Sequence, residues 1–243
     1  MTVRFAFGCL CAMTASLLLG CNNMPGHPPP GPEVPRPDSI SDFNTLYGQN
    51  CTACHGVEGG NGPAIALNNP EYQAIVDEAT LRKWIANGQP GTLMPAFAQS
   101  AGGLLTDAQI DDIVHGMRAR WYKAGVLDGQ NPPPYAASKP GDPQHGQQAF
   151  QTFCASCHSN PSDSQNKQGA KASSITDPTY LALVSDQSLR SITIAGRPDI
   201  GQPDWRNDVP NRPMTDQEVT DVVAWLASQR SPTPGQPYPS SSK

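Results

Sequence analysis

Cys51-Thr52-Ala53-Cys54-His55 is the stretch around which the chain is organised, and Cys154-Ala155-Ser156-Cys157-His158 repeats it later in the sequence. Cys-x-x-Cys-His is the attachment sequence of a c-type haem. Two thiols one helical turn apart reach the vinyl groups along one porphyrin edge, and the histidine that follows lies under the ring, where it can ligate iron. A single copy also fits a zinc half-site or a redox dithiol. Two copies in equivalent surroundings favour two covalently attached haem c groups.

Each motif supplies two attachment cysteines and one iron ligand. Cys51 and Cys54 would hold the first haem (haem one), with His55 as the proximal ligand of its iron. We expect the other ring nitrogen of His55 to donate to a backbone carbonyl of the following loop, that of Pro63, because such a bond fixes the orientation of the ring. The equivalent residues for the second haem (haem two) are Cys154, Cys157 and His158.

The sixth ligand of haem one is expected to be Met94. This methionine lies between Gly91 and Pro95 in a loop that separates two predicted helices, so its thioether can point at the iron. Methionine together with histidine raises the reduction potential of a haem relative to harder ligands. A methionine that fills a gap in the core is the alternative, and Met117, inside a predicted helix, fits that role better.

Haem two departs from this pattern. Tyr72 and Tyr180 start two stretches that align without a gap. In this alignment Gln202 stands opposite Met94, and a carboxamide is a poor ligand for iron. Met214 is nearby, but the residue before a helix cap typically packs as a hydrophobic staple. We therefore expect haem two to have a weak Gln202 ligand, a water, an open position, or Met214 after a loop shift, and to have a lower potential than haem one.

The sequence around the motifs predicts helices. Apolar residues recur at helical spacing in both halves, and no run shows the period-two alternation of a strand. A capping box begins at Thr106 in the first half and at Thr215 in the second, and Thr80 is expected to cap a further helix. The predicted fold class is therefore all-α, with two small helical domains in tandem, each wrapped around one haem.

The N-terminus resembles a bacterial lipoprotein signal. Arg4 precedes the apolar run 5–19, which is too short for a membrane-spanning helix. The Leu-Leu-Gly that leads into Cys21 is similar to a lipobox, so we expect Cys21 to be lipidated and to anchor the protein. All seven cysteines are then assigned, because Cys9 and Cys11 leave with the signal peptide and no spare thiol remains in an oxidising compartment.

Composition limits the size of the core and the class of partner. The chain has 243 residues, of which 37% are hydrophobic, and a formal net charge of −5. Two small domains fit this length, and no basic cluster indicates nucleic acid as a partner. The 26 prolines gather mainly between the predicted domains and at the ends. We expect a signal peptide over 1–20, a Pro-rich stalk over 21–40, the first domain over 41–123, a linker over 124–141, the second domain over 142–231 and a disordered tail over 232–243.

Taken together, the motifs and the Met94-Pro95 loop resemble those of a di-haem member of the class I cytochrome c family. The resemblance covers both predicted domains and implies an all-α haem fold that transfers electrons and is not an enzyme. The stretches 42–47 and 91–97 are also similar to segments of the lipoprotein cytochrome subunits of alternative complex III. Gln202 departs from the family pattern at the sixth ligand of haem two.

Three functions follow from these observations. The first is an electron carrier on the periplasmic side of a bacterial membrane, lipid-anchored, between a quinol-oxidising complex or dehydrogenase and a terminal oxidase. The second is a haem enzyme or a gas-binding protein that uses an open haem two, although the sequence identifies no proton donor near Gln202. The third is a structural lipoprotein subunit, which is compatible with the first.

Overall fold

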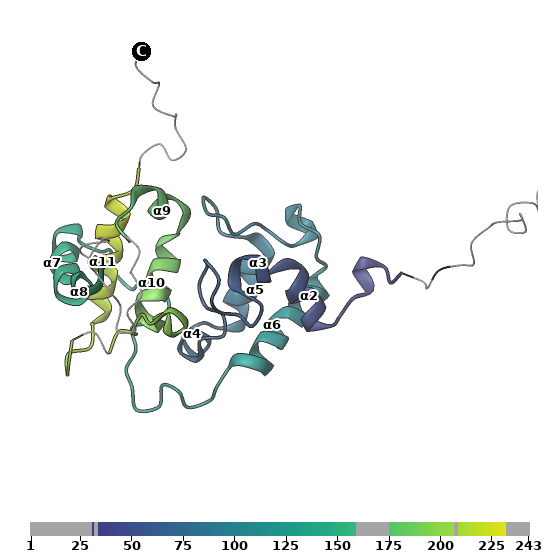
Figure 1. Ribbon diagram of the computed structural model, residues 1–243, viewed down its shortest axis with the longest axis horizontal. Coiled ribbons are helices and arrows are strands. Elements are labelled where there is room, and N and C mark those ends of the chain that lie inside the picture. The colour runs from purple at the N-terminus through teal and green to yellow at the C-terminus, as the bar shows by residue number, and fades with distance from the viewer. Residues whose placement is uncertain (1–30, 32–33, 159–174, 207–208, 232–243) are drawn as a thin grey trace, which may run out of the picture. The chain divides into compact units, whose positions relative to one another are not determined.

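The computed structural model describes residues 31, 34–158, 175–206 and 209–231 (Figure 1). The predicted signal peptide over 1–20, the predicted lipid site Cys21 and the predicted tail over 232–243 lie outside these residues. The chain divides into two compact units, Met1–Ser39 and Ile40–Lys243. In the first unit the described residues include one short 3-10 helix, η1, at Pro37–Ser39. Among the described residues, no helix is both long enough and apolar enough to cross a membrane.

The first half of the second unit is built from helices. Asp42 caps α2 through a hydrogen bond from the backbone N–H of Thr45 to its carboxylate (2.8 Å). The cap of α5 is Asp77, which accepts from the N–H of Thr80 (2.6 Å), so the expectation that Thr80 itself caps this helix is wrong. The helices are α2 Phe43–Asn50, α3 Thr52–His55, α4 Pro70–Ile75, α5 Glu78–Asn87, η2 Gln99–Ala101 and α6 Asp107–Trp121.

Helix α6 organises the core of this half. Its capping box at Thr106 and Gln109 is present, as the sequence predicts. Phe43 and Tyr47 of α2 pack against Trp121 near the end of α6, with the Tyr47 and Trp121 ring centroids 5.2 Å apart. Met117 is buried in the same core. Aromatic pairs in this edge-to-face arrangement add to the burial of apolar area.

The second half repeats the order of the first. Phe150 of α7 packs against Trp225 of α11 with ring centroids 4.5 Å apart and ring planes tilted by 45°, and the two helices lie side by side in Figure 1. The capping box at Thr215 and Glu218 is also present. The helices are α7 Pro143–Phe153, α8 Ala155–His158, α9 Pro178–Leu183, α10 Asp186–Ala195, η3 Pro198–Ile200 and α11 Asp216–Ser228.

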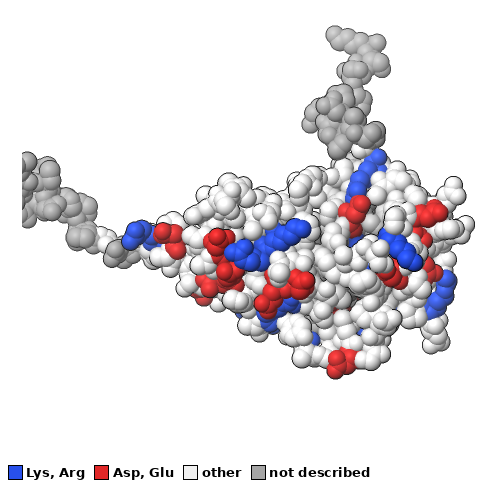
Figure 2. All heavy atoms as spheres, turned by 180° about the vertical axis from the view of Figure 1, so that it is seen from behind, with Lys and Arg blue, Asp and Glu red and all other residues white. Residues whose placement is uncertain are grey.

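The described residues therefore confirm the all-α prediction. Their only extended pairings are two isolated bridges, Ala98 with Leu105 and Arg197 with Gln202. Each bridge lies in the segment between the second long helix of a half and its last helix, where the sequence places the distal ligands. On the face shown in Figure 2, acidic and basic side chains lie interspersed.

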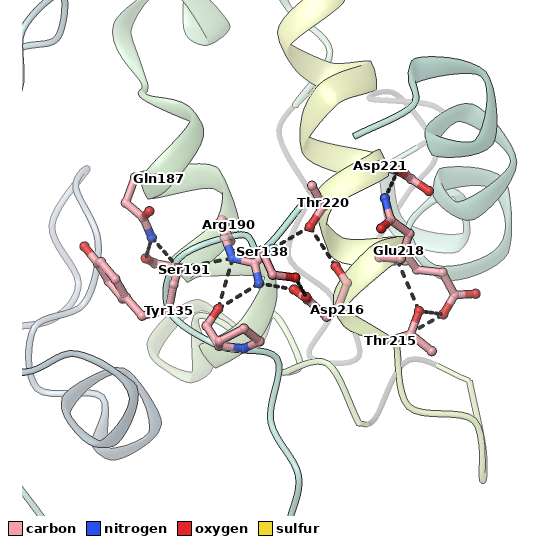
Figure 3. A network of polar contacts seen from close by, with 12 residues as sticks. Tyr135, Ser138, Gln187, Arg190, Ser191, Thr215, Asp216, Glu218, Thr220 and Asp221 are labelled. Carbon is pink, nitrogen blue, oxygen red and sulfur yellow. Dashed lines mark hydrogen bonds and ion pairs between the residues drawn. The ribbon is translucent and has the colours of Figure 1, made fainter. Parts of the chain in front are cut away.

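The segment between the halves, predicted as a linker over 124–141, is fastened by a polar network (Figure 3). Arg190 of α10, only 3% exposed, donates to the carbonyl of Pro134 (2.7 Å) and to the hydroxyl of Thr220 (2.8 Å), and pairs with Asp216. Tyr135 joins both halves, because its hydroxyl accepts from the indole N–H of Trp84 (2.8 Å). These bonds hold part of the predicted linker against both halves.

Candidate haem sites

The first attachment motif lies at the junction of α2 and α3. The N–H of Cys51 donates to the carbonyl of Tyr47 (2.9 Å), and the N–H of His55 donates to the carbonyl of Cys51 (2.9 Å). The chain therefore makes a tight turn that carries both thiols, with Cys51 half-buried and Cys54 exposed. The two thiols lie one helical turn apart, and one is half-buried while the other is exposed. This arrangement suits attachment to one edge of a haem that would pack on this surface.

His55 is held in one orientation. Its ring is 8% exposed, and its Nδ1 lies 2.9 Å from the carbonyl oxygen of Ile65. The carbonyl acceptor is therefore Ile65, and the expectation of Pro63 is wrong. The reason is the path of the loop, since the N–H of Ala64 bonds to the carbonyl of Cys54 (2.9 Å) and the carbonyl of the next residue, Ile65, lies beside Nδ1. This bond assigns the proton to Nδ1, so that Nε2 is the nitrogen that would ligate iron.

The ionisation of the site fits a ligand rather than a redox dithiol. Burial lowers the pKa of His55, the Arg197 charge lowers it further, and the bond to Ile65 opposes the shift. The ring is therefore neutral at neutral pH, as an iron ligand must be. Burial, helped by the nearby Cys54, raises the pKa of the Cys51 thiol to about 12. A disulfide-exchanging cysteine needs the opposite shift.

The loop after the motif packs directly on it. A Cβ at Gly62 would lie 2.3 Å from the carbonyl oxygen of Cys54 and 2.7 Å from the N atom of Gly56. Only a residue without a side chain permits this approach. The segment from Gly62 to Ile65 therefore forms the support against which His55 is oriented.

Met94 lies in a loop that is pinned to the end of α5. The N–H of Gln89 donates to the carbonyl of Met94 (3.0 Å), and the N–H of Met94 lies 3.2 Å from the hydroxyl oxygen of Thr92. Gly88 has a φ of 66°, and a Cβ there would lie 2.6 Å from the carbonyl oxygen of Met94. The half-buried thioether is thus presented from a defined backbone, and its ligation of iron stays a prediction.

The loop that contains Gln202 starts and closes in the same way, although its intervening residues form the 3-10 helix η3. The N–H of Arg197 donates to the carbonyl of Gln202 (3.0 Å), and Gly196, with a φ of 71°, approaches that carbonyl as Gly88 approaches Met94. The gap-free alignment that places Gln202 opposite Met94 is therefore confirmed in three dimensions. The Gln202 amide lies 3.4 Å from the carbonyl oxygen of Ile192, a long hydrogen bond.

Met214 packs in the core of the second half. It is 5% exposed, and its N–H donates to the carbonyl of Trp205 (2.8 Å). Leu105 makes the equivalent bond to Phe97 in the first half (2.8 Å). Met214 and Val219 belong to one apolar cluster. This placement fits the hydrophobic-staple interpretation of Met214.

The second attachment motif repeats the turn of the first. The N–H of His158 donates to the carbonyl of Cys154 (2.9 Å), and His158, Cys154 and Cys157 are all half-buried. The carbonyl partner expected for the ring of His158 belongs to the segment 159–174, which is outside the described residues. The paired thiols and the adjacent imidazole are the donor set that a covalently bound haem requires.

Two residues near the first site were missed by the sequence analysis. Arg197 and Asp199, from the Gln202 loop, contact the loop that follows His55. An arginine followed two residues later by an aspartate suggests a local ion pair, which is the only signal in the sequence. Nothing in the spacing indicates that this pair reaches the other half of the chain.

Comparisons with known proteins agree with this arrangement. Residues 38–115 match the family model described as cytochrome c oxidase, cbb3-type, subunit III, and residues 143–230 match the cytochrome c family model. Each matched region contains one attachment motif. A chain in the structure of the Kuenenia stuttgartiensis reducing HAO-like protein complex is similar over 82% of this chain and 100% of its own length, with 16% identity and a TM-score of 0.45. No curated protein matches the chain.

Proposed function

We propose that this chain, which carries two cytochrome c domains, is a di-haem electron carrier with one haem on Cys51 and Cys54 and one on Cys154 and Cys157. The observation that carries the proposal is the fixed imidazole of His55 beside its two thiols, held by the 2.9 Å bond to Ile65. The haem supplies the one-electron chemistry when bound. The protein attaches the haem, orients the iron ligand and shields the haem from water.

The two haems are proposed to differ in ligation. His55 and Met94 would ligate haem one, and His158 with the Gln202 position would face haem two. Because a thioether raises the reduction potential of a haem, haem two should have the lower potential. Electrons would then pass from haem two to haem one, and the unequal loops would give the transfer its direction.

The proposed location is the periplasmic side of a bacterial membrane, since cytochrome c domains are typically extracytoplasmic. Lipidation at Cys21 is proposed from the sequence alone and would provide the anchor. The proposed partners are a quinol-oxidising complex or a dehydrogenase as donor and a terminal oxidase as acceptor. The similarity of residues 38–115 to a cbb3-type oxidase subunit supports a respiratory role.

The Gln202 position supports a second candidate function. Without a thioether, haem two would have a weak or exchangeable sixth ligand and could bind a small gas or react with a peroxide. Carbon monoxide added to the reduced protein separates the two functions. Rapid binding of one equivalent at haem two would favour the second candidate, and no binding would favour the carrier.

The carrier proposal is tested by haem content and axial ligation. We expect two covalent haems per chain in a pyridine haemochrome assay, and a thioether-to-iron charge-transfer band of one-haem intensity in the oxidised protein. Met94→Ala should abolish this band. Met214→Leu is the matched control, because Met214 lies in the core and its replacement should leave the band intact. A wild-type chain without covalent haem, or a band of two-haem intensity, would contradict the assignment.

A further inference from the structure

Arg197 and Asp199 form a buried ion pair in the loop of the second domain that contains Gln202. Their side chains are 6% and 8% exposed. The guanidinium is bidentate, with Nε 2.9 Å from Oδ1 and Nη2 2.7 Å from Oδ2 of Asp199. The backbone of Arg197 is bonded to Gln202 in both directions (3.0 Å each). The position of this pair is therefore linked to the position of the proposed distal residue of haem two.

The same pair binds the first domain. Nη2 of Arg197 donates to the carbonyl of Gly62 (2.9 Å), and the carboxylate of Asp199 accepts from the N–H of Asn61 (2.7 Å). Asn61 has a φ of 62°, in the left-handed region that non-glycine residues adopt at some cost. A charged acceptor on its N–H stabilises this conformation. The second domain thus fixes the backbone at Asn61 and Gly62.

These two residues begin the segment that orients His55. Gly62 packs on the carbonyl of Cys54, Ala64 bonds to that carbonyl, and Ile65 accepts the Nδ1 proton of His55. A shift of the backbone at Gly62 would therefore move the acceptor of the imidazole. The contacts from the Gln202 loop to the His55 ring are continuous and pass through one ion pair and one short backbone segment.

We propose that the Arg197–Asp199 pair is a positioning device that couples the distal loop of haem two to the proximal ligand of haem one. The inference rests on the proposed ligation of haem one by His55. Burial of two charges is a weak source of stability, because the loss of hydration offsets much of the attraction. The pair is better explained by the conformation that it imposes on Asn61 and Gly62. Because coupling between sites is reciprocal, a change at either haem should be felt at the other.

A second arginine at the same interface provides the control. Arg206 lies 3.2 Å from Glu71 of α4 and 2.6 Å from Asp204. Arg206 therefore also joins the two domains through a carboxylate, but its partner is not in the segment that orients His55. If the Arg197 contact serves only to dock the domains, replacement of either arginine should have the same effect at haem one.

The experiment uses the full-length protein with both haems attached. The double variant Arg197→Gln/Asp199→Asn removes the pair without leaving one buried charge unpaired, and Arg206→Gln is the matched control. In the double variant we expect the amide of Asn61 to exchange about 10- to 100-fold faster, since a bond to a charged acceptor is lost. The hyperfine-shifted NMR resonances of His55 in the oxidised protein should move. In Arg206→Gln the exchange rate of the Asn61 amide and the His55 resonances should stay at the wild-type values.

Two outcomes would overturn the inference. One is a double variant with two haems and wild-type His55 resonances; the other is an equal shift in Arg206→Gln. A double variant that fails to retain its haems is replaced by Arg197→Lys, which keeps the charge but loses the bidentate geometry. That variant should move the His55 resonances in the same direction by a smaller amount, and unchanged resonances would overturn the inference. A wild-type protein without two haems would instead refute the proposed function.

Discussion

The two distal loops are closed by the same backbone hydrogen bond but differ in side chains and in the backbone between its ends. Gly88 and Gly196 both have a positive φ, and the next residue in each case bonds to the carbonyl of the proposed distal residue. In the first loop that residue is Met94, which offers a thioether. In the second it is Gln202, whose loop carries the ion pair that holds the first domain. One loop is suited to ligation and the other to contact between domains.

The residues that follow the two glycines show the same divergence. Gln89 of the first loop accepts from the hydroxyl of Ser185 at the start of α10 (2.7 Å). Arg197 of the second loop reaches Gly62. Both positions face the other domain, but only the arginine contacts the segment that orients His55, the proposed iron ligand. A few side chains can therefore give two loops that are closed in the same way separate roles, one in ligation and the other in contact between domains.

The largest expected effect comes from restoring the thioether in the second loop. Gln202→Met places methionine at the position equivalent to Met94, in a loop closed by the same backbone hydrogen bond, so haem two should gain His/Met ligation and a higher potential. The thioether-to-iron band should double in intensity. Spectroelectrochemical titration should show the two potentials closer together.

Gln202→Leu is the control for this change, because it has similar bulk and no donor atom. It should give no new band. If Gln202→Met also leaves the band at one-haem intensity, the second loop does not face its haem as the first one does. Position 202 would then not be equivalent to Met94 as a ligand position.

An intermediate effect is expected from the equivalent helix caps Asn69 and Asp177. Both accept hydrogen bonds from the first turn of the following helix. Asn69 is 2% exposed, and its Nδ2 also donates to the carbonyls of Ala195 (2.8 Å) and Gly196 (3.2 Å). Asn69→Asp should lower the free energy of unfolding by about 3 kcal/mol, because a carboxylate would face two carbonyls in a buried site. Urea unfolding measures this change.

Asp177→Asn is the reciprocal exchange at an exposed cap. Asn and Asp are nearly equal as helix caps, so its effect should stay within about 0.5 kcal/mol. Equal losses in both variants would mean that the contact of Asn69 with the second domain contributes little to stability.

The sequence predicted the parts of the site that local spacing determines. The motifs, the capping boxes and the gap-free alignment of Gln202 with Met94 depend on residues close together in the chain. The acceptor for His55 was assigned to Pro63 instead of Ile65, because the choice depends on how the loop folds back on Cys54. Asp77 and Thr80 are both residue types that suit a helix cap, and the helix begins three residues earlier than a cap at Thr80 would require.

The contacts between the domains could not be predicted in this way. Arg197 bonds to Gly62 across 135 positions of sequence, and Arg190 bonds to the carbonyl of Pro134 across 56 positions. A proline-rich composition predicts a linker without a core. It does not predict the polar network that fastens the segment 124–141. Long-range polar contacts of this kind need the folded arrangement.

The smallest expected effect concerns the charge of Asp199. Although burial opposes it, hydrogen bonds from Arg197 and from the N–H of Asn61 hold the pKa of Asp199 below its ordinary value of 3.8. A lowered folded-state pKa means that the ionised group stabilises the protein fully above about pH 4, and that this contribution is lost as the pH falls through the folded-state pKa. The double variant Arg197→Gln/Asp199→Asn, which leaves no buried charge unpaired, should therefore cost about 1 kcal/mol at neutral pH and less in acid.

Unfolding by urea at several pH values between about 7 and about 2 measures the difference in unfolding free energy between wild type and this double variant. Asp42, Asp77 and Asp177 also have lowered pKa values, each held down first by a backbone N–H. They are present in both proteins, so the pH dependence of the difference isolates Asp199. A difference that stays constant into acid would mean that Asp199 acts as a hydrogen-bond acceptor in either ionisation state. The two distal loops would then differ in shape and hydrogen bonding, and the negative charge of Asp199 would not be part of the difference between them.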